Sequence, residues 1–542
     1  MAKPTGFRGA FRDDEVACAV YSEGAGIARA IPDAVAVPAD ADDVSAIVAW
    51  AWETGTAIIP RGSGSGMAGG ATGSGVVVDL SRLDDIADVP GDPSRMWVGP
   101  GALRGAVNRR AEVRGLRFPI DPSSGGFCTL GGMVATNAAG AHSLQFGSVR
   151  RWITALDCVF ADGSRATVRR GEPEPTGVPA IRRFSEHAEE LRGSANRGEL
   201  GHSQVRKQSS GYALAEYADT GELVDLLVGS EGSLVLFVGI ELALTPLPAA
   251  TSSLLAAFPA LGAAAEGAAC ASARGATACE LLDRTFLDVA RAGETLVPAP
   301  EGTEAVLLIE FEADTASRAN DKARLMKRAL VDAGASEVVV ALHPMMERML
   351  WSLRHAASPV LMTLDPRLRS MQFIEDGAVP PSHLAEYIHG IRASLASRGI
   401  RGVIFGHAGD AHLHVNPLID VHQSDWRAGV LDLLDEVTRL TADLYGTLSG
   451  EHGDGRLRTP LLDRVWNPAA TAAFRRVKKA FDPDGTLNPG VKVPLDGQRS
   501  IDQVKYDPQL APLPPRARAA LDLVARESAY GHFRLALLGD PD

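Results

Sequence analysis

Residues 60–70 read PRGSGSGMAGG and decide which class of fold the N-terminal half of the chain can adopt. Positions 64–69, GSGMAG, match the G-x-G-x-x-G pattern of nicotinamide-binding Rossmann domains literally. In a Rossmann site the last glycine opens a helix that faces the pyrophosphate, whereas this chain continues through further glycines into VVVDL at 76–80, an expected strand. The pattern therefore excludes a Rossmann site. It predicts a loop, beside Arg61, whose bare backbone N–H groups can approach a phosphate.

A β-α-β pattern precedes this loop. AVAVP at 34–38 predicts a strand, DADDVSAIVAWAWETG at 40–55 predicts a helix, and TAIIP at 56–60 predicts a second strand. Asp40 is a suitable N-cap, and Gly55 is the residue type expected directly after the helix.

A second glycine-rich segment, DPSSGGFCTLGGMVATNAAG, occupies residues 121–140. Its small polar residues lie in an otherwise apolar context, which is hard to explain by a flexible linker. Two such loops in one domain predict a single long anionic cofactor.

Length and composition limit the number of domains and the classes of function that the chain can have. A chain of 542 residues is too long for one hydrophobic core, so about two or three domains are expected. The net charge of −13 gives no basis for nucleic-acid binding. No apolar run of about 20 residues is present to cross a bilayer. The N-terminus has no secretory signal, so we expect a cytoplasmic protein, compatible with peripheral attachment to the inner face of the membrane. The five cysteines show no ligand spacing for zinc or an iron–sulfur cluster.

Changes in pattern divide the chain into segments. Residues 250–440 alternate apolar runs with helix-like stretches, among them AAAEGAACASARGATACELLDRTFLDVAR at 263–291, which predicts a second domain of α+β or α/β class with a sheet covered on one face. The expected segments are an N-terminal arm (1–30), a first domain (31–248), a second domain (249–440), a C-terminal catalytic segment (441–495) and a peripheral tail (496–542).

Residues 404–416, IFGHAGDAHLHVN, place three of the chain's thirteen histidines within eight residues. In a strand, side chains two residues apart share one face, so His412 and His414 would point together while Leu413 points the other way. This arrangement suits a metal ion and equally suits a structural cluster of hydrogen-bonded histidines.

Eight segments, in order, resemble a known group of flavoproteins. Four of them resemble the FAD-binding domain of the vanillyl-alcohol oxidase/p-cresol methylhydroxylase (PCMH) superfamily: 60–70, 121–140, FGSVRRW at 146–152 and VGSEGSL at 228–234. The other four resemble its FAD-linked D-2-hydroxyacid dehydrogenase branch, which includes D-lactate, glycolate and D-2-hydroxyglutarate dehydrogenases: WSLR at 351–354, GHAGDAHLHVN at 406–416, SGEHGDGRLR at 449–458 and FDPDGTLNPGVKVP at 481–494.

The resemblance implies an α+β protein. A PCMH-type FAD-binding domain of two subdomains would be followed by an α+β substrate (cap) domain with an antiparallel sheet and by a C-terminal segment that returns to the flavin. Some relatives attach FAD through a histidine in the first loop, where this chain has Ser63, Gly64 and Ser65, so non-covalent FAD is expected. The implied FAD-binding residues are Arg61, Gly62, Ser63, Gly64, Ser65, Pro122, Ser123, Gly132, Asn137, Gly147, Ser148, Glu231, Gly232 and Asn488.

The same resemblance implies a metal-assisted active site. His407, His414 and Glu451 correspond to its metal ligands, and this donor set suits a divalent ion such as Zn²⁺. His412 stands where relatives often carry Asn, and its role as a ligand or as a neighbour of the ligands is open. Asn416 resembles a position that contacts substrate.

Two further residues carry the implied chemistry. His452 corresponds to a general base and Arg354 to an arginine that binds the substrate carboxylate. The alternatives are a structural hydrogen-bonding role for His452 and a surface salt bridge for Arg354. Some relatives have a lysine where this chain has Ile374, so recognition of the substrate side chain is open, with Arg369 a substitute only if its loop folds back. Glu375 and Asp376 fit either a polar pocket or an exposed acidic turn.

We therefore expect an FAD-dependent, metal-assisted oxidation of a D-2-hydroxy acid to the 2-oxo acid, with hydride transfer to flavin N5. The alternatives are an oxidase that uses O₂ and a non-catalytic flavin subunit of an oxidoreductase complex. No cysteine follows Cys279, so electrons would pass to a separate iron–sulfur protein, an electron-transfer flavoprotein or a quinone. A homodimer is a compatible assembly. The expected helix at 517–529 could dock a partner or pack on its own domain.

Overall fold

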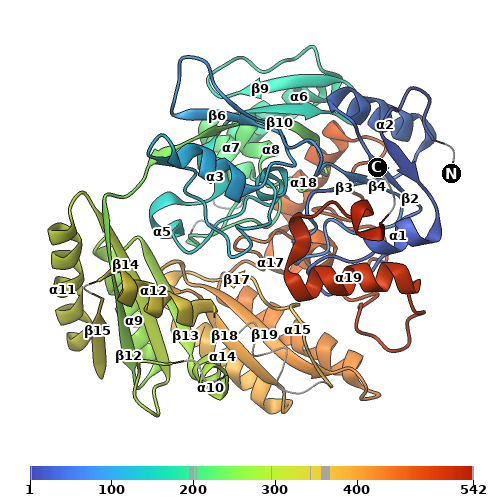
Figure 1. The fold of residues 1–542 in the computed structure, drawn as a ribbon. Coiled ribbons are helices and arrows are strands. Elements are labelled where there is room, and N and C mark those ends of the chain that lie inside the picture. The colour runs from blue at the N-terminus through green and yellow to red at the C-terminus, as the bar shows by residue number, and fades with distance from the viewer. Residues whose placement is uncertain are drawn as a thin grey trace.

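The computed structural model describes residues 1, 3–193, 200–202, 204–293, 296–341, 343–355 and 367–539. Figure 1 shows two lobes: the N-terminal lobe contains both termini, and the second lobe contains the middle of the chain. In the part of the chain that is described, no helix combines the length and apolar character needed to span a bilayer.

The first sheet of the N-terminal lobe is built around the β-α-β unit. Its strand order is β1 (Ala10–Arg12), β2 (Ala34–Val37), β4 (Val76–Asp79) and β3 (Ile58–Arg61), with β2, β4 and β3 parallel. Helix α2 (Ala41–Thr54) begins at Asp40, whose side chain accepts from the N–H groups of Asp42 and Asp43. It ends at Gly55, whose φ of 66° suits glycine. The predictions for this unit are confirmed.

The second sheet of this lobe is antiparallel. Its order is β5 (Ile86–Asp88), β6 (Arg95–Val98), β10 (Leu236–Ala243), β8 (Ile153–Val159) and β9 (Arg165–Arg169). Apolar side chains of α2 pack between the two sheets, so the sheets form two subdomains of one unit. The helices of this half are α3 (Arg104–Glu112), α4 (Leu130–Thr136), α5 (Ser143–Phe146), α6 (Pro179–Gly193), α7 (Leu214–Thr220) and α8 (Leu223–Leu227).

The second lobe, called the cap domain below, begins after the two-residue strand β11 (Thr245–Pro246), which pairs with β7 (Leu116–Arg117). Its antiparallel sheet has the order β15 (Glu337–Val340), β12 (Ala250–Phe258), β14 (Ala305–Ala313), β13 (Ala278–Asp283), β18 (Arg401–His407), β19 (His412–Asp420) and β16 (Leu368–Ser370), and β17 (Gly377–Ala378) also pairs with β19. The helices are α9 (Leu261–Ala273), α10 (Arg284–Ala292), α11 (Ala316–Asp332), α12 (Pro344–His355), α14 (Leu384–Ser397) and α15 (Trp426–Asp443).

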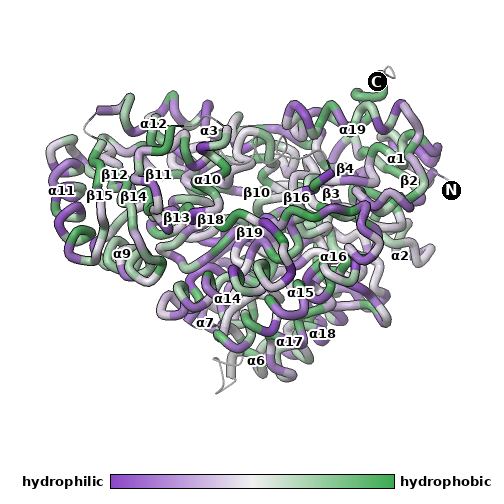
Figure 2. The backbone as a smooth tube through the Cα atoms, turned by 90° about the horizontal axis from the view of Figure 1, so that it is seen from below, coloured by the Kyte–Doolittle hydropathy of each residue, from purple (hydrophilic) through white to green (hydrophobic). Residues whose placement is uncertain are grey.

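Helices cover both faces of the cap sheet, so the expectation of a sheet covered on one face was wrong. Along β12, Leu254, Ala256 and Phe258 enter one apolar cluster, while Leu255 and Ala257 enter another on the opposite face. Strands buried on both faces are apolar without alternation. Helix α11 on one face of the sheet is amphipathic instead, and Figure 2 shows it as a mixture of purple and green segments.

The long helix-like stretch at 263–291 is not one helix. It folds as α9, strand β13 and α10, with the break near Gly275, whose φ is +74°. The alanine-rich composition of α9 continues into β13, and this continuity hid the strand. Its central position in the sheet follows from pairing with both β14 and β18.

After α15 the chain returns to the N-terminal lobe through α16 (Gly455–Arg458), α17 (Leu462–Val465) and α18 (Pro468–Phe481). Phe474, Val477 and Phe481 of α18 join the main core of that lobe. Helix α19 (Pro515–Glu527) then packs on α1 (Glu15–Tyr21), beside which it lies in Figure 1. This helix therefore packs on its own chain, which resolves the alternative left open by the sequence. Ala525, expected on its apolar side, is exposed.

Candidate active site

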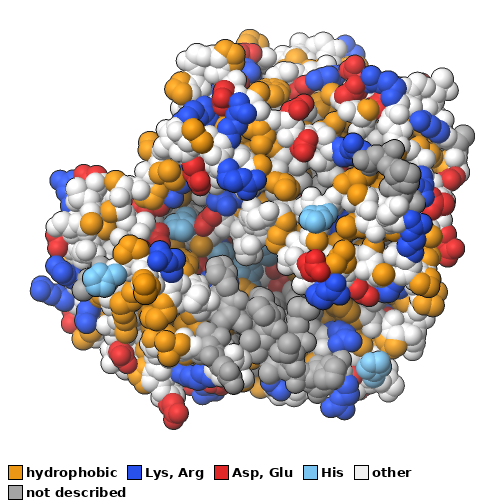
Figure 3. Space-filling view, in the orientation of Figure 1, with side chains coloured by type: hydrophobic (Ala, Val, Ile, Leu, Met, Phe, Trp, Pro, Cys, Tyr) orange, Lys and Arg blue, Asp and Glu red, His pale blue; other side chains and the backbone are white. Residues whose placement is uncertain are grey.

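A cavity of about 400 Å³ extends from the glycine loops of the N-terminal lobe to the histidine cluster of the cap domain. The space-filling view in Figure 3 shows the molecule hollowed between the lobes, with histidine side chains inside the hollow. The cavity brings together many of the residues singled out from the sequence: Arg61, Gly62, Ser63, Gly64, Ser65, Pro122, Ser123, Gly132, Glu231, Gly232, Arg354, His414, Asn416, Glu451 and His452.

Two glycines of the first glycine loop have no room for a side chain. A Cβ on Gly62 would lie 2.2 Å from Thr129 Oγ1, and one on Gly64 would lie 2.3 Å from the Arg61 guanidinium. Arg61 itself is turned into the protein, where it donates to the carbonyl oxygens of Tyr21, Glu23 and Ala71. The Arg61 side chain thus shapes the loop, and bare backbone is presented to the cavity. This surface fits the diphosphate of a dinucleotide.

Four of the expected cofactor residues do not line the cavity. Asn137 ends α4 with φ 52°, and its amide bonds the backbone of Gln208 and Arg150. Gly147 ends α5, and Ser148 precedes the 3₁₀ turn η1 (Val149–Trp152). Asn488 donates to the carbonyl oxygens of Gly70 and Glu231. These contacts place Asn137 and Asn488 as supports of the cavity wall.

Glu231 is a buried link between the lobe and the C-terminal segment. Its carboxylate accepts from the N–H groups of Asp454 (2.7 Å) and Gly455 (3.0 Å) and lies 3.0 Å from Lys492 Nζ. The chain that follows Glu451 is thereby fixed to the wall of the cofactor cavity.

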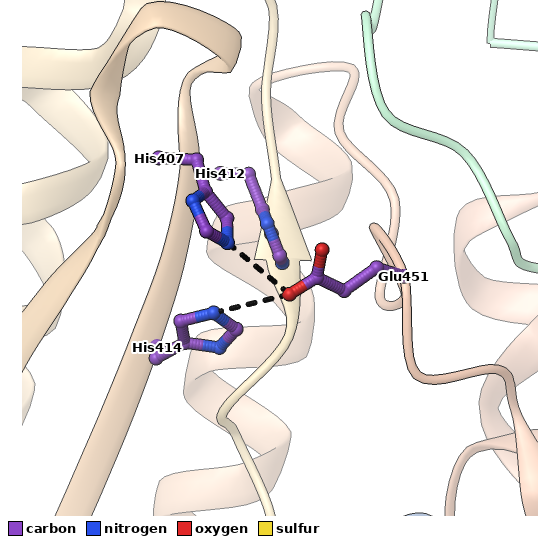
Figure 4. A group of neighbouring side chains, drawn as sticks. All are labelled: His407, His412, His414 and Glu451. Carbon is purple, nitrogen blue, oxygen red and sulfur yellow. Dashed lines mark hydrogen bonds and ion pairs between the residues drawn. The ribbon is translucent and has the colours of Figure 1, made fainter. Parts of the chain in front are cut away.

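The β18–β19 hairpin carries the histidine cluster. His412 and His414 share one face of β19 while Leu413 enters the core, as predicted from the strand pattern. His407 Nε2 lies 3.2 Å and His414 Nε2 lies 3.3 Å from the same oxygen, Glu451 Oε1, as the dashed lines in Figure 4 show.

The opposite nitrogens of these two rings are held by acceptors. His407 Nδ1 lies 2.5 Å from Glu280 Oε1, and His414 Nδ1 lies 2.9 Å from the carbonyl oxygen of Glu375. Neutral rings anchored in this way turn unprotonated Nε2 atoms toward a carboxylate oxygen, an arrangement that requires a cation or a proton between them. Burial opposes the charging of His407, but Glu280 raises its pKa above the ordinary value. The donor set therefore fits a divalent metal that replaces this proton.

His412 belongs to the same buried cluster but has other partners. Its Nε2 lies 2.8 Å from Asp376 Oδ1 and its Nδ1 lies 3.5 Å from Lys207 Nζ. Burial and the nearby lysine lower the pKa of His412 to about 3, so the ring is neutral. This geometry favours a role beside the ligands over a role as a ligand.

Lys207 is a site residue that the sequence did not reveal. The ammonium lies 2.8 Å from Glu451 Oε2 and donates to the carbonyl oxygen of Gly140. Despite burial, Lys207 and His407 hold the pKa of Glu451 well below its ordinary value. The sequence feature that could have pointed to Lys207 is the cationic pair in VRKQSSGY at 205–212. This segment lies far from the histidine motifs in the sequence.

Arg354 of α12 is not a surface residue. Its Nε donates to Glu280 Oε2 at 2.6 Å, and its guanidinium lies 4.7 Å from the centre of the Phe405 ring, at the cavity wall. Glu280, fully buried on β13, thus orients both Arg354 and His407. It is the second residue that the sequence missed.

His452 faces the cavity next to Glu451. Its Nδ1 lies 2.7 Å from Glu375 Oε2, and its Nε2 lies 3.7 Å from Glu451 Oε1. Burial alone would lower the pKa of His452, but Glu375 and Asp376 raise it to about 10. Both carboxylates are buried and paired with Arg458, so the exposed acidic turn that was one alternative for them is excluded.

The remaining wall near Arg354 is formed by Gln372, Phe405 and Asn416. Ile374 points into the apolar core of the cap domain and is 6% exposed. Arg369 lies on strand β16 and is not among the residues that line this cavity.

Comparisons with known protein families and individual proteins show what this chain is similar to. The family model "FAD binding domain" matches residues 32–169, and "FAD linked oxidases, C-terminal domain" matches residues 247–491. Glycolate oxidase subunit GlcD of Bacillus subtilis is 28% identical over 482 residues, covering 87% of this chain and 91% of that protein. Probable mitochondrial D-lactate dehydrogenase of Danio rerio is 28% identical, with 85% and 84% covered.

Coverage differs among the relatives. D-2-hydroxyglutarate dehydrogenase of Pseudomonas putida is 28% identical over 92% of this chain, but the match covers 52% of that protein, so the chain spans about half its length. Among solved structures, 4-ethylphenol oxidase from Gulosibacter chungangensis superimposes with a TM-score of 0.65 at 16% identity, covering 89% of this chain and 94% of that one. This last likeness shows the fold. The chain thus combines, in this order, a region that matches the FAD binding domain family and a region that matches the C-terminal domain of FAD linked oxidases.

Proposed function

We propose that this protein oxidises a D-2-hydroxy acid to the corresponding 2-oxo acid, with non-covalently bound FAD and a divalent metal, for which Zn²⁺ is favoured. The observation that carries the proposal is the convergence of His407 and His414 on Glu451 Oε1 beside His452, in the cavity that the glycine loops line. The relatives named for glycolate, D-lactate and D-2-hydroxyglutarate support this class of substrate.

The cofactors and the side chains of the protein contribute different parts of the reaction. When bound, FAD supplies the two-electron acceptor at N5, and a divalent metal held by His407, His414 and Glu451 supplies Lewis acidity toward an alcohol oxygen. Arg354, oriented by Glu280, binds the substrate carboxylate through its guanidinium. Asn416 and Gln372 provide amide groups at the same wall.

His452 is the group that receives the hydroxyl proton. Its Nδ1 is engaged with Glu375, so Nε2 is the atom available on the side of Glu451. Its raised pKa means that the ring is protonated at neutral pH beside Glu375 and Asp376. Positive charge bound by Glu451 opposes that protonation and gives the neutral ring that a base requires.

The electrons must leave the flavin for an acceptor. We propose a separate carrier, which is an iron–sulfur protein, an electron-transfer flavoprotein or a quinone. Direct use of O₂ is the competing function. A non-catalytic flavin subunit is disfavoured, because such a protein would have no need for His407, His414 and Glu451 in one buried cluster with His452 beside it.

Anaerobic mixing of the purified protein with a panel of D- and L-2-hydroxy acids tests the proposal. We expect bleaching of the flavin absorbance by a D-2-hydroxy acid, restored by an artificial dye and only slowly by O₂. An oxidised spectrum with every acid, in metal-replete protein, would refute the proposed reaction, and rapid hydrogen peroxide formation would favour the oxidase.

A further inference from the structure

We propose that the C-terminal segment 515–539 is part of the FAD site, in which Tyr530 contacts the cofactor and Arg534 supplies positive charge for its pyrophosphate. Both family models end before this segment, at residues 169 and 491. The contacts of these two side chains place the segment at the glycine loops.

Tyr530 reaches the cavity that the glycine loops line. Its ring packs on Phe127, another residue of the cavity wall, with ring centres 5.3 Å apart. Phe127 belongs to the second glycine-rich segment, so the C-terminal segment touches the wall directly.

Arg534 lies behind Tyr530 and against the first glycine loop. Its guanidinium carbon is 5.4 Å from the centre of the Tyr530 ring, and its Nη2 donates to the carbonyl oxygen of Ser63 at 3.3 Å. The residue is only 3% exposed, and among the described residues its Nε and Nη1 have no hydrogen-bond partner. A buried guanidinium with two unpaired nitrogens is costly unless an anion is present.

The local charge balance strengthens this requirement. Arg61 and Lys505 are nearby cations, and Arg61 Nε is also without a hydrogen-bond partner among the described residues. Asp79 is a carboxylate near Arg534, and it already accepts from the Tyr21 hydroxyl and from the N–H of Ser81. The nearby carboxylate of Glu23 is paired with Arg29 and Arg518. Burial and the charge of Arg61 lower the pKa of Arg534 to about 10, which still leaves it charged at neutral pH. The cations of this region outnumber its carboxylates, which leaves a net positive charge next to the loop.

Packing of the segment explains how Arg534 is held there. Leu521 and Val524 of α19 pack against Val20 and Tyr21 of α1. Arg518 adds an ion pair with Glu23 at 3.1 Å, and the carbonyl oxygen of Glu23 also accepts from Arg61. The segment is therefore anchored through α1 to the residue that shapes the glycine loop. A pyrophosphate held by that loop is the anion best placed to compensate the charge of Arg534.

The test compares FAD release from holoenzyme variants. Arg534→Met removes the charge and keeps the apolar stem, and Tyr530→Leu removes the ring. Arg526→Met is the matched control, because Arg526 is on the same segment with its side chain 69% exposed. FAD fluorescence after dilution measures release. We expect release about tenfold to a hundredfold faster for Arg534→Met, faster release for Tyr530→Leu, and no change for Arg526→Met.

Protein from which FAD has been removed separates a cofactor role from a structural one. Loss of an uncompensated buried cation should leave the unfolding temperature of the FAD-free Arg534→Met protein unchanged or higher. The added stability that FAD gives should shrink in the same variant. Equal destabilisation with and without FAD, or wild-type release rates, would overturn the proposal. Arg534→Lys keeps the charge, and its release rate should lie between those of wild type and Arg534→Met.

Discussion

Lys207 Nζ lies 2.8 Å from Oε2 of Glu451, the oxygen of that carboxylate that does not face His407 and His414. One oxygen of Glu451 is therefore committed to an internal ion pair, and the other is presented to the two histidines. Lys207 belongs to the N-terminal lobe and Glu451 to the segment that follows the cap domain, so the ion pair joins distant parts of the chain at the site.

Replacing Lys207 with Met should destabilise the metal-free protein more than the metal-bound protein. The substitution leaves the buried Glu451 carboxylate without its closest cation, and breaking a buried ion pair in this way costs about 3 kcal/mol or more. A bound divalent ion restores a positive neighbour. Thermal unfolding with chelator and with saturating Zn²⁺ measures the difference. Lys327→Met, at an exposed position of α11, is the control. Equal loss of stability in both conditions would argue against this role for Lys207.

Removal of one metal ligand should separate metal binding from FAD binding. His414→Ala is expected to lose the metal and turnover and to keep FAD, because His414 meets Glu451 while the glycine loops are untouched. His412→Asn is the buried comparison and should retain metal, since His412 Nε2 is bonded to Asp376. Metal content by elemental analysis and flavin content by absorbance decide the outcome. Wild-type metal content in His414→Ala would show that His414 is not a metal ligand.

Sequence patterns predicted the parts of this fold whose signals are local. The capped helix α2 and the shared face of His412 and His414 follow from residue periodicity and cap chemistry. Glu280 could not be found in this way, because it lies on β13 inside an alanine-rich stretch with helical composition. Its position became meaningful only when β13 paired with β18 and placed Glu280 opposite His407.

Other site residues depend on contacts that no sequence pattern carries. Lys207 reaches Glu451 across 244 positions of the chain. The segment after residue 495 was expected to be peripheral, yet Tyr530 lines the cavity and Arg534 bonds the carbonyl oxygen of Ser63. The contacts of Tyr530 and Arg534 depend on the packing of α19 on α1. The buried face of α19 is too short for its periodicity to specify the partner.

Replacing His452 with Ala should slow the chemical step while FAD and metal remain bound. Its ring lines the cavity and its Nδ1 is bonded to Glu375, so the substitution removes the proposed base and leaves the glycine loops in place. We expect flavin reduction in single turnover to slow by about 10²- to 10⁴-fold. Stopped-flow absorbance under anaerobic conditions measures this rate. His389→Ala, at an exposed position of α14, should behave as wild type. Near-normal reduction by His452→Ala would assign His452 a structural role.

The substrate wall predicts a preference for 2-hydroxy acids with a single carboxylate. Arg354 is the guanidinium placed at this wall, and the neighbouring groups described there are the amides of Gln372 and Asn416 and the ring of Phe405. Ile374 is turned into the core, and the sequence of residues 356–366 contains no Lys, Arg or His. A second carboxylate on the substrate would therefore be desolvated without a matching cation, which penalises binding of a dicarboxylic acid.

Kinetics of flavin reduction with D-lactate and with D-2-hydroxyglutarate measure this preference. We expect kcat/KM to be higher for D-lactate by about tenfold or more, since one unpaired buried charge costs at least about 1.4 kcal/mol. Ile374→Lys is not expected to reverse the preference, because that side chain is packed between core residues and does not line the cavity. Gln372→Lys places a cation at the wall and should reduce the ratio of kcat/KM for D-lactate to kcat/KM for D-2-hydroxyglutarate. A wild-type preference for D-2-hydroxyglutarate would show that a cation outside the described wall reaches the substrate.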